Sequence, residues 1–448
     1  MALVGLTVRV PTISHMSPVS RGRKPKKSKN RPSGRSGAGS PRAGRAQAGS
    51  AAEVSPVDLF VGSRERPAWF DPTIAAVLDG SGAVLAADGP RVLEEATVEL
   101  VGGQIRHAVR DVRRGLWVDW WFAQLTEATA ARIHDELDRG GTGWEGPWRL
   151  LHGLSAIGSP ALASGATTAA RRLAAKVARA GGPGEARWLP AMRRLSSTGE
   201  VWHLCDAYGS RIGVIAGFTY PGGVDPSVFL FDVDACGMVT VVNAGVYDDV
   251  AQAVAAWRAF AGESASDAEP AAAQRADELV CLAYADHGGE IFQGDESDSA
   301  LDNWFRTSRR LHELADALRR RGTPLPRATN LHRDLDAGPL VDAFATWYSD
   351  RHGNPPAPEP LDALAYEWIE GRLPGTWHAA SPHRVRHIRG LISDWVDDPV
   401  TKEASALLPD WIRWHAEQTD LPEHLLAASL AAVADNLDRP DLGAPCMT

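Results

Sequence analysis

Cysteine is scarce in this sequence, and the few cysteines are far apart. The 448 residues include only four, Cys205, Cys236, Cys281 and Cys446, and no two of them form a CxxC pair. Secreted proteins that depend on disulfides carry many more cysteines for their size. The cysteine content therefore argues against a secreted disulfide scaffold and predicts a cytoplasmic protein.

Long apolar runs are also absent. The nearest candidate, residues 228–246, is interrupted by Asp232, Asp234 and Asn243, whereas a membrane-spanning helix needs roughly 20 apolar residues. Residues 1–13 are mildly apolar, but the main run of basic residues follows this stretch, which is the reverse of the order in a signal peptide. We expect no membrane partner.

Carboxylates are missing from the first 52 residues. This segment holds 11 of the 47 Lys and Arg residues and no Asp or Glu, so the rest of the chain carries a net charge of −20 within the total of −9. Residues 1–55 are rich in Gly, Ser, Pro and Arg and nearly free of aromatics, a composition that predicts a disordered basic tail. Met16 directly precedes the basic run, which leaves two candidate translation starts, Met1 and Met16. Only six lysines accompany 41 arginines, and this bias resembles a bacterial composition.

The remaining chain predicts an α+β fold that is predominantly helical and multidomain, with one small antiparallel sheet. Apolar residues alternate over residues 211–220, and residues 227–233 are apolar on both faces; both patterns predict strands. Residues 201–206 and 238–242 complete a predicted sheet of three or four strands. Apolar residues at helical spacing then predict an amphipathic helix over residues 247–261. We therefore expect a disordered tail (1–55), a helical domain (56–198), the sheet with its helix (199–262) and a second helical domain (263–448).

Asp232 and Asp234 stand at the end of a predicted strand with DxD spacing. This spacing is similar to that of haloacid-dehalogenase-like phosphatases, and the resemblance implies that Asp232 attacks phosphorus and Asp234 protonates the leaving group. The family continues with Gly-Thr, whereas here Ala235, Cys236 and Gly237 lead into another strand. A hairpin turn explains the same residues, so these aspartates are catalytic candidates for an alternative function only.

Other catalytic motifs are incomplete. The sequence at 331–335 is similar to a protein-kinase catalytic loop, but Pro339 occupies the position of the metal-binding Asn. Ser155 lacks the second glycine of a GxSxG nucleophile turn. His203 and Cys205 alternate on a predicted strand and are a possible nucleophile pair, but a partly buried strand face is the favoured interpretation.

Histidines and arginines gather at the start of a helix predicted over residues 382–396. His383 and His387 have the i, i+4 spacing that can chelate zinc, but no third ligand is near in sequence and Arg384 and Arg386 stand between them. The free N–H groups of a helix N-terminus attract anions. We therefore predict no metal here, and we take Arg384 and Arg386 as candidate contacts to an anion.

The basic run at residues 21–35 is the most specific functional signal, with eight positive charges in 15 residues. Such a run neutralises phosphates and gives salt-sensitive binding to nucleic acid. Its candidate contact residues are Arg21, Arg23, Lys24, Lys26, Lys27, Lys29 and Arg31. The leading prediction is a non-enzymatic interaction or regulatory protein whose tail contacts nucleic acid or an acidic partner. The alternatives are a phosphatase-like hydrolase at strands 203–234 and a helical protein–protein adaptor. No cofactor is predicted, and the sequence leaves the oligomeric state open.

Overall fold

The structure of this chain is a computed structural model that describes residues 66–109, 117–180, 188–288, 296–332, 335–393 and 399–434. The basic tail predicted over residues 1–55, with all of its candidate contacts from Arg21 to Arg31, lies outside these residues. The described residues belong to one compact unit of the chain, Val61–Thr448.

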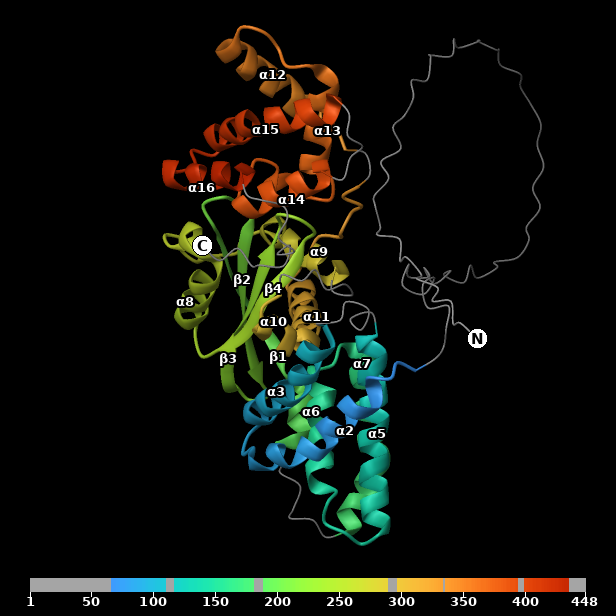
Figure 1. Ribbon diagram of the computed structural model, residues 1–448. Helices are drawn as coiled ribbons and strands as arrows, with labels where there is room; N and C mark the ends of the chain where they lie inside the picture. The colour runs from blue at the N-terminus through green and yellow to red at the C-terminus, as the bar shows by residue number, and fades with distance from the viewer. Residues whose placement is uncertain are drawn as a thin grey trace, which may run out of the picture. The chain divides into compact units, whose positions relative to one another are not determined.

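The first part of this unit consists of helices around a single apolar core (Figure 1). These are α2 (Phe70–Gly80), η1 (Ser81–Ala86), α3 (Pro90–Val109), α5 (Val118–Asp138), α6 (Glu145–Ile157), α7 (Pro160–Arg179) and the short η2 (Leu189–Arg194). In α7 the buried stripe is mostly alanine, and these small side chains allow it to pack closely on its neighbours. Gly153 allows an equally close contact in α6, since a Cβ atom there would lie 2.0 Å from Thr97 Oγ1.

The second part is a five-stranded antiparallel sheet in the order β4-β3-β2-β1-β5. Its strands are β1 (Ser196–Cys205), β2 (Arg211–Tyr220), β3 (Val224–Asp234), β4 (Thr240–Tyr247) and the two-residue β5 (Ala271–Ala272). Helix α8 (Val250–Ala261) covers one face, while α9 (Val280–Gly288) and α11 (Trp304–Arg320) pack on the other. Because both faces are covered, β3 is apolar on both sides over most of its length.

The predicted strand at residues 238–242 and the predicted helix at 247–261 differ from the structure in their boundaries. Strand β4 continues to Tyr247 because it pairs with β3 along its whole length. Helix α8 begins at Val250 because the side chain of Asp249 caps it, accepting a hydrogen bond from the Gln252 N–H at 2.8 Å. Short elements connect the sheet to its covering helices; they are η3 (Glu263–Ala265), η4 (Ala276–Leu279) and α10 (Asp298–Asp302).

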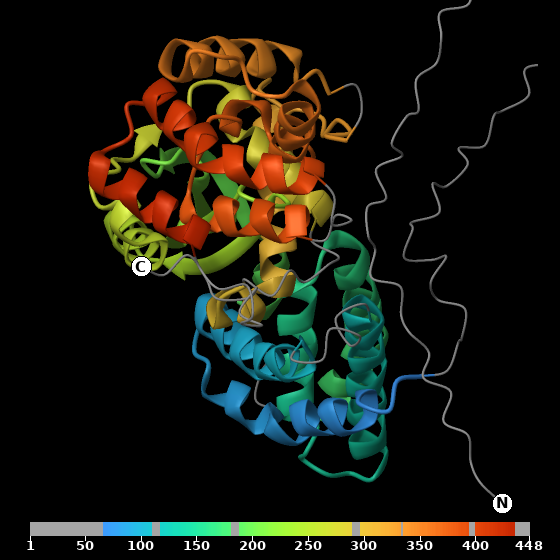
Figure 2. The same cartoon turned by 45° about the horizontal axis from the view of Figure 1, so that its top comes forward.

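The third part is again helical and lies against one end of the sheet (Figures 1 and 2). It contains α12 (Gly338–His352), α13 (Pro358–Ile369), η5 (Pro374–Thr376), α14 (Pro382–Ser393), α15 (Pro399–Gln418) and α16 (Glu423–Ala434). Trp368, Trp411 and Phe344 are buried in its core, so these tryptophans serve packing. Among the described helices, none is both long enough and apolar enough to cross a lipid bilayer.

A buried ionic cluster ties the first helices to the sheet region. Glu94 of α3 is 2% exposed, and its carboxylate accepts hydrogen bonds from Tyr220 Oη at 2.7 Å, from Arg306 Nη1 at 3.3 Å and from Arg310 Nη2. Arg306 also binds Glu95, and Arg310 also binds Glu313. Helices α3 and α11 and strand β2 are therefore joined by charge as well as by apolar contacts.

The predicted fold class is confirmed: the protein is α+β and mostly helical, with one small antiparallel sheet. The first core also contains Leu301 and Phe305, from α10 and α11, so contacts cross the boundary placed at residue 198. The division into domains 56–198, 199–262 and 263–448 stays a prediction.

Candidate functional site

The predicted catalytic aspartate Asp232 is fully buried in an ion pair with Arg211. Arg211 Nε donates to Asp232 Oδ1 at 2.6 Å and its Nη2 donates to Oδ2 at 2.9 Å, while Trp257 Nε1 donates to Oδ1 at 3.0 Å. Gly213, opposite Asp232 in the ladder, leaves room for the indole, since a Cβ there would lie 3.0 Å from Trp257 Nε1. Both oxygens of Asp232 are thus held by protein donors that link β2, β3 and α8.

Asp234 lies two residues further along the same face and contacts the start of α14. Its Oδ1 accepts a hydrogen bond from the Cys236 N–H at 2.6 Å, and its Oδ2 lies 3.1 Å from His383 Nδ1. Burial alone would raise the pKa of Asp234, but the hydrogen bond and charge of His383, with the charge of Arg211, hold it well below its usual value. Burial opposes the charge of His383 in turn, yet Asp234 and Cys236 raise its pKa well above normal. The structure therefore brings together two candidates that the sequence left separate.

Arg384 and Arg386, the predicted anion contacts on α14, differ in their surroundings. Arg384 is fully buried and donates to the carbonyl oxygens of Thr376, Ala379 and Ala235. Arg386 is exposed, because residues two apart on a helix project in nearly opposite directions. The structure does not bring these two guanidinium groups to one ligand. The assignment of Arg386 as an anion contact, and that of Asp232 and Asp234 as phosphatase residues, stay predictions.

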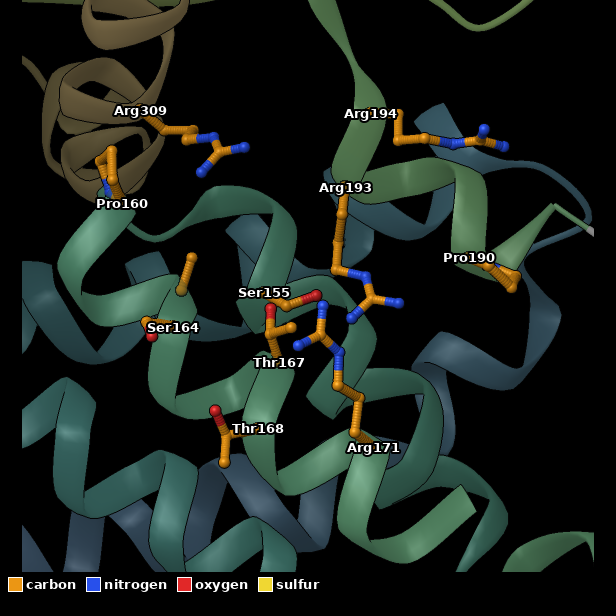
Figure 3. Close-up of a pocket in the computed structure, with 11 residues that line it drawn as sticks. Ser155, Pro160, Ser164, Thr167, Thr168, Arg171, Pro190, Arg193, Arg194 and Arg309 are labelled. Carbon is orange, nitrogen blue, oxygen red and sulfur yellow. The ribbon is translucent and has the colours of Figure 1, made fainter. Parts of the chain in front are cut away.

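A cavity of about 510 Å³ lies between α6, α7, η2 and α11 (Figure 3), and the sequence did not predict it. It is lined by Ser155, Pro160, Ala163, Ser164, Thr167, Thr168, Arg171, Pro190, Arg193, Arg194 and Arg309. We call it the arginine pocket, because four of its lining residues are arginines, contributed by three elements. Figure 3 shows the side chains of Arg171 and Arg193 converging beside Ser155 and Thr167.

Local sequence explains how each element presents its polar side chains to this pocket. Ser164, Thr167 and Arg171 follow the i, i+3, i+7 spacing of one helical face, beside the alanine stripe that buries α7. Leu189 and Met192 are buried and anchor η2, which leaves its two arginines at the pocket.

The electrostatic character of the arginine pocket is positive. Among the described residues that line it there is no Asp or Glu. Arg309 Nε donates to Glu313 at 2.7 Å, whereas Arg171 and Arg194 form no ion pair with any described residue. Burial, together with the charge of Arg193, lowers the pKa of the nearby His152 to about 4. The charge of Arg193 therefore adds to the effect of burial in favouring the neutral form of His152.

The chemistry of the arginine pocket is that of binding an anion. Guanidinium and hydroxyl groups donate hydrogen bonds to oxyanions, and arginine matches carboxylate and phosphate with two parallel bonds. The described lining residues include no His, Cys, Asp or Glu that would act as a base or nucleophile. The one sequence signal for this site was the polar face of α7. It could not be recognised from the sequence, because arginines occur along the whole chain and those of α7 do not stand out.

Comparison of the chain with protein-family models, with curated proteins and with solved structures gives no match.

Proposed function

We propose that this chain is a non-enzymatic binding or regulatory protein that holds a phosphate-bearing small molecule in the arginine pocket. The observation that carries the proposal is that Arg171, Arg193, Arg194 and Arg309 all line one cavity of about 510 Å³. Cavities of this size accept small metabolites and cofactors, for which about 300–1,000 Å³ is usual. The low cysteine count supports a cytoplasmic site of action.

A phosphate group suits the arginine pocket better than a carboxylate does. A terminal phosphate offers three acceptor oxygens and up to two negative charges, whereas a carboxylate offers two oxygens and one charge. The four arginines and the hydroxyls of Ser164, Thr167 and Thr168 provide more donors than one carboxylate can use. A ligand with a phosphate or diphosphate group therefore accepts hydrogen bonds from more of the pocket's donors.

The test measures binding of inorganic phosphate, pyrophosphate and ATP to the full chain by isothermal titration calorimetry. Arg171→Gln and Arg194→Gln each remove one charged donor, which contributes about 1.5–3 kcal/mol, so affinity falls roughly 10- to 100-fold. Arg172→Gln is the matched control, because Arg172 is the next residue of α7, is exposed and does not line the pocket.

Two results would contradict this proposal. One is that none of the three probes binds at millimolar concentration. The other is that Arg172→Gln weakens binding as much as Arg171→Gln. The loss of affinity would then come from the lower overall positive charge and not from the pocket.

A second proposal concerns the basic tail, which we expect to contact nucleic acid or an acidic partner. Its support is the run of eight positive charges within residues 21–35 and the salt-sensitive binding that such runs produce. The tail and the arginine pocket would both select anionic partners, but each is tested separately.

A further inference from the structure

Three side chains with metal-binding chemistry meet where the end of β3 contacts the start of α14. Asp234, Cys236 and His383 each offer one ligand atom, and these atoms lie within 4.8 Å of one another. Asp234 and Cys236 are buried, while the His383 side chain is 18% exposed. The cluster is therefore enclosed by protein, with His383 on the side open to solvent.

The two strand-end ligands are arranged by their own turn. Asp234 Oδ1 accepts the Cys236 N–H at 2.6 Å, and this bond fixes the turn that follows β3. Two arginines bind the same turn to the third helical part: Arg372 Nε donates to the Cys236 carbonyl oxygen at 2.9 Å, and Arg384 Nη2 donates to that of Ala235 at 2.9 Å. The turn and the helix that carries His383 are thus held together before any ligand binds.

We propose that Asp234, Cys236 and His383 form a binding site for Zn²⁺ or a similar divalent transition-metal ion. Carboxylate, thiolate and imidazole are the groups that bind zinc in proteins, and three protein ligands leave a fourth position for water. Mg²⁺ and Ca²⁺ prefer sites made only of oxygen ligands, so the thiolate of Cys236 selects against them.

The spacing within the cluster is close to what a tetrahedral site needs. With metal bonds of about 2.0–2.1 Å, the oxygen and nitrogen ligands of a tetrahedral zinc lie about 3.3 Å apart, and Asp234 Oδ2 and His383 Nδ1 are 3.1 Å apart. The Ser381 hydroxyl lies 2.9 Å from Cys236 Sγ, where it can donate a hydrogen bond to the thiolate. Such outer contacts orient metal ligands and tune their affinity.

The arginines around the cluster oppose a cation, but their charges are offset locally. Arg211 is paired with Asp232 through two hydrogen bonds, and its Nη1 lies farther off, 3.7 Å from Asp234 Oδ2. Arg384 and Arg372 donate to backbone carbonyl oxygens, which carry partial negative charge. With the carboxylate of Asp234 and the thiolate of Cys236 in contact with the ion, the nearest charges are negative.

This proposal departs from the prediction of no metal at His383 and His387. That prediction relied on the lack of a third ligand near in sequence and on the two arginines between the histidines. In the structure His383, without His387, meets a ligand 149 residues away, at Asp234. Cys236 adds a second ligand from the same turn.

The test uses Co²⁺ as a spectroscopic probe of the full chain, purified with chelator and reductant and then freed of both. One equivalent of Co²⁺ is expected to produce a sulfur-to-cobalt charge-transfer band and intense visible bands of tetrahedral cobalt, which Zn²⁺ then abolishes. Cys236→Ser removes the charge-transfer band, and His383→Gln weakens Co²⁺ binding at least about tenfold. Cys281→Ser, which changes another buried cysteine, leaves the spectrum unchanged.

Circular dichroism of each variant shows whether it is folded. If Cys236→Ser does not fold, the partly exposed His383→Gln and the wild-type spectrum decide the matter. The proposal is wrong if the wild-type chain gives no charge-transfer band. It is equally wrong if the band survives in Cys236→Ser or disappears in Cys281→Ser. It is also wrong if a folded His383→Gln variant binds Co²⁺ as tightly as the wild-type chain does. Phosphate binding in the arginine pocket is measured without metal, so the two proposals fail independently.

Discussion

Replacing Glu94 by glutamine removes a buried negative charge that two buried arginines share. Arg306 and Arg310 are each 2% exposed, and both donate to Glu94, as does Tyr220. Removing one partner of a buried ion pair costs about 3–5 kcal/mol, because the remaining charge stays buried. Here Arg306 keeps Glu95 and Arg310 keeps Glu313, so we expect the lower end, about 3 kcal/mol.

Glu95→Gln is the matched control, since Glu95 is the next residue of α3 and also pairs with Arg306, at 2.8 Å. Its side chain is 45% exposed, so we expect a loss of less than about 1 kcal/mol. Urea unfolding followed by tryptophan fluorescence and circular dichroism gives the free energy of unfolding of each variant. If the two variants cost the same, or if Glu94→Gln costs under about 1 kcal/mol, the reasoning about burial is refuted.

The pH dependence of this difference has a defined sign. Burial opposes the charge of Glu94, but Arg310 and Arg306 together with Tyr220 lower its pKa below the usual value. A lowered carboxyl pKa contributes stability that is present above the unfolded value of about 4.3 and is lost as pH falls through the folded value. The difference in the free energy of unfolding between the wild type and Glu94→Gln should therefore be largest at neutral pH and become smaller in acid.

Three further predictions concern the tail, a helix contact and a buried histidine. The tail variant replaces four lysines by glutamine, at Lys24, Lys26, Lys27 and Lys29. Binding of this variant to duplex DNA is measured by fluorescence anisotropy over a series of salt concentrations. The slope of log K against log salt concentration should become less steep by about 3 to 4, and an unchanged slope would exclude the lysines as DNA contacts. Gly102→Ala should cost about 1–3 kcal/mol in thermal unfolding, because its Cβ would lie 2.4 Å from the Asp302 backbone. The adjacent Gly103→Ala, with nothing nearer than 4.0 Å, should be neutral or stabilising, and equal losses would contradict this. His152 has its pKa lowered to about 4 by burial and by Arg193, so the folded state needs its neutral form and loses stability as pH falls from about 6.5. His152→Gln should reduce the loss in unfolding free energy between about pH 7 and pH 5 by about 2 kcal/mol, and a loss as large as that of the wild type would contradict the assignment.

Local patterns in the sequence were sufficient to predict the fold class and most elements of the sheet. The alternation of apolar residues predicted β2 with its observed limits, and the helical spacing over residues 247–261 predicted α8, which begins only at Val250. These patterns succeed because strand and helix periodicity depend on neighbours in the chain. The charge division into a basic tail and an acidic remainder likewise follows from the sequence alone.

The candidate sites depend on contacts between residues far apart in the chain. Asp234 meets His383 across 149 residues, and Glu94 meets Arg310 across 216. The arginine pocket collects its guanidinium groups from α7, η2 and α11. No local periodicity records which distant side chains become neighbours, because that is decided when apolar faces are buried against each other. The sequence by itself therefore determined the elements and the charge of this protein, and only tertiary packing decided which of its many arginines, aspartates and histidines lie together.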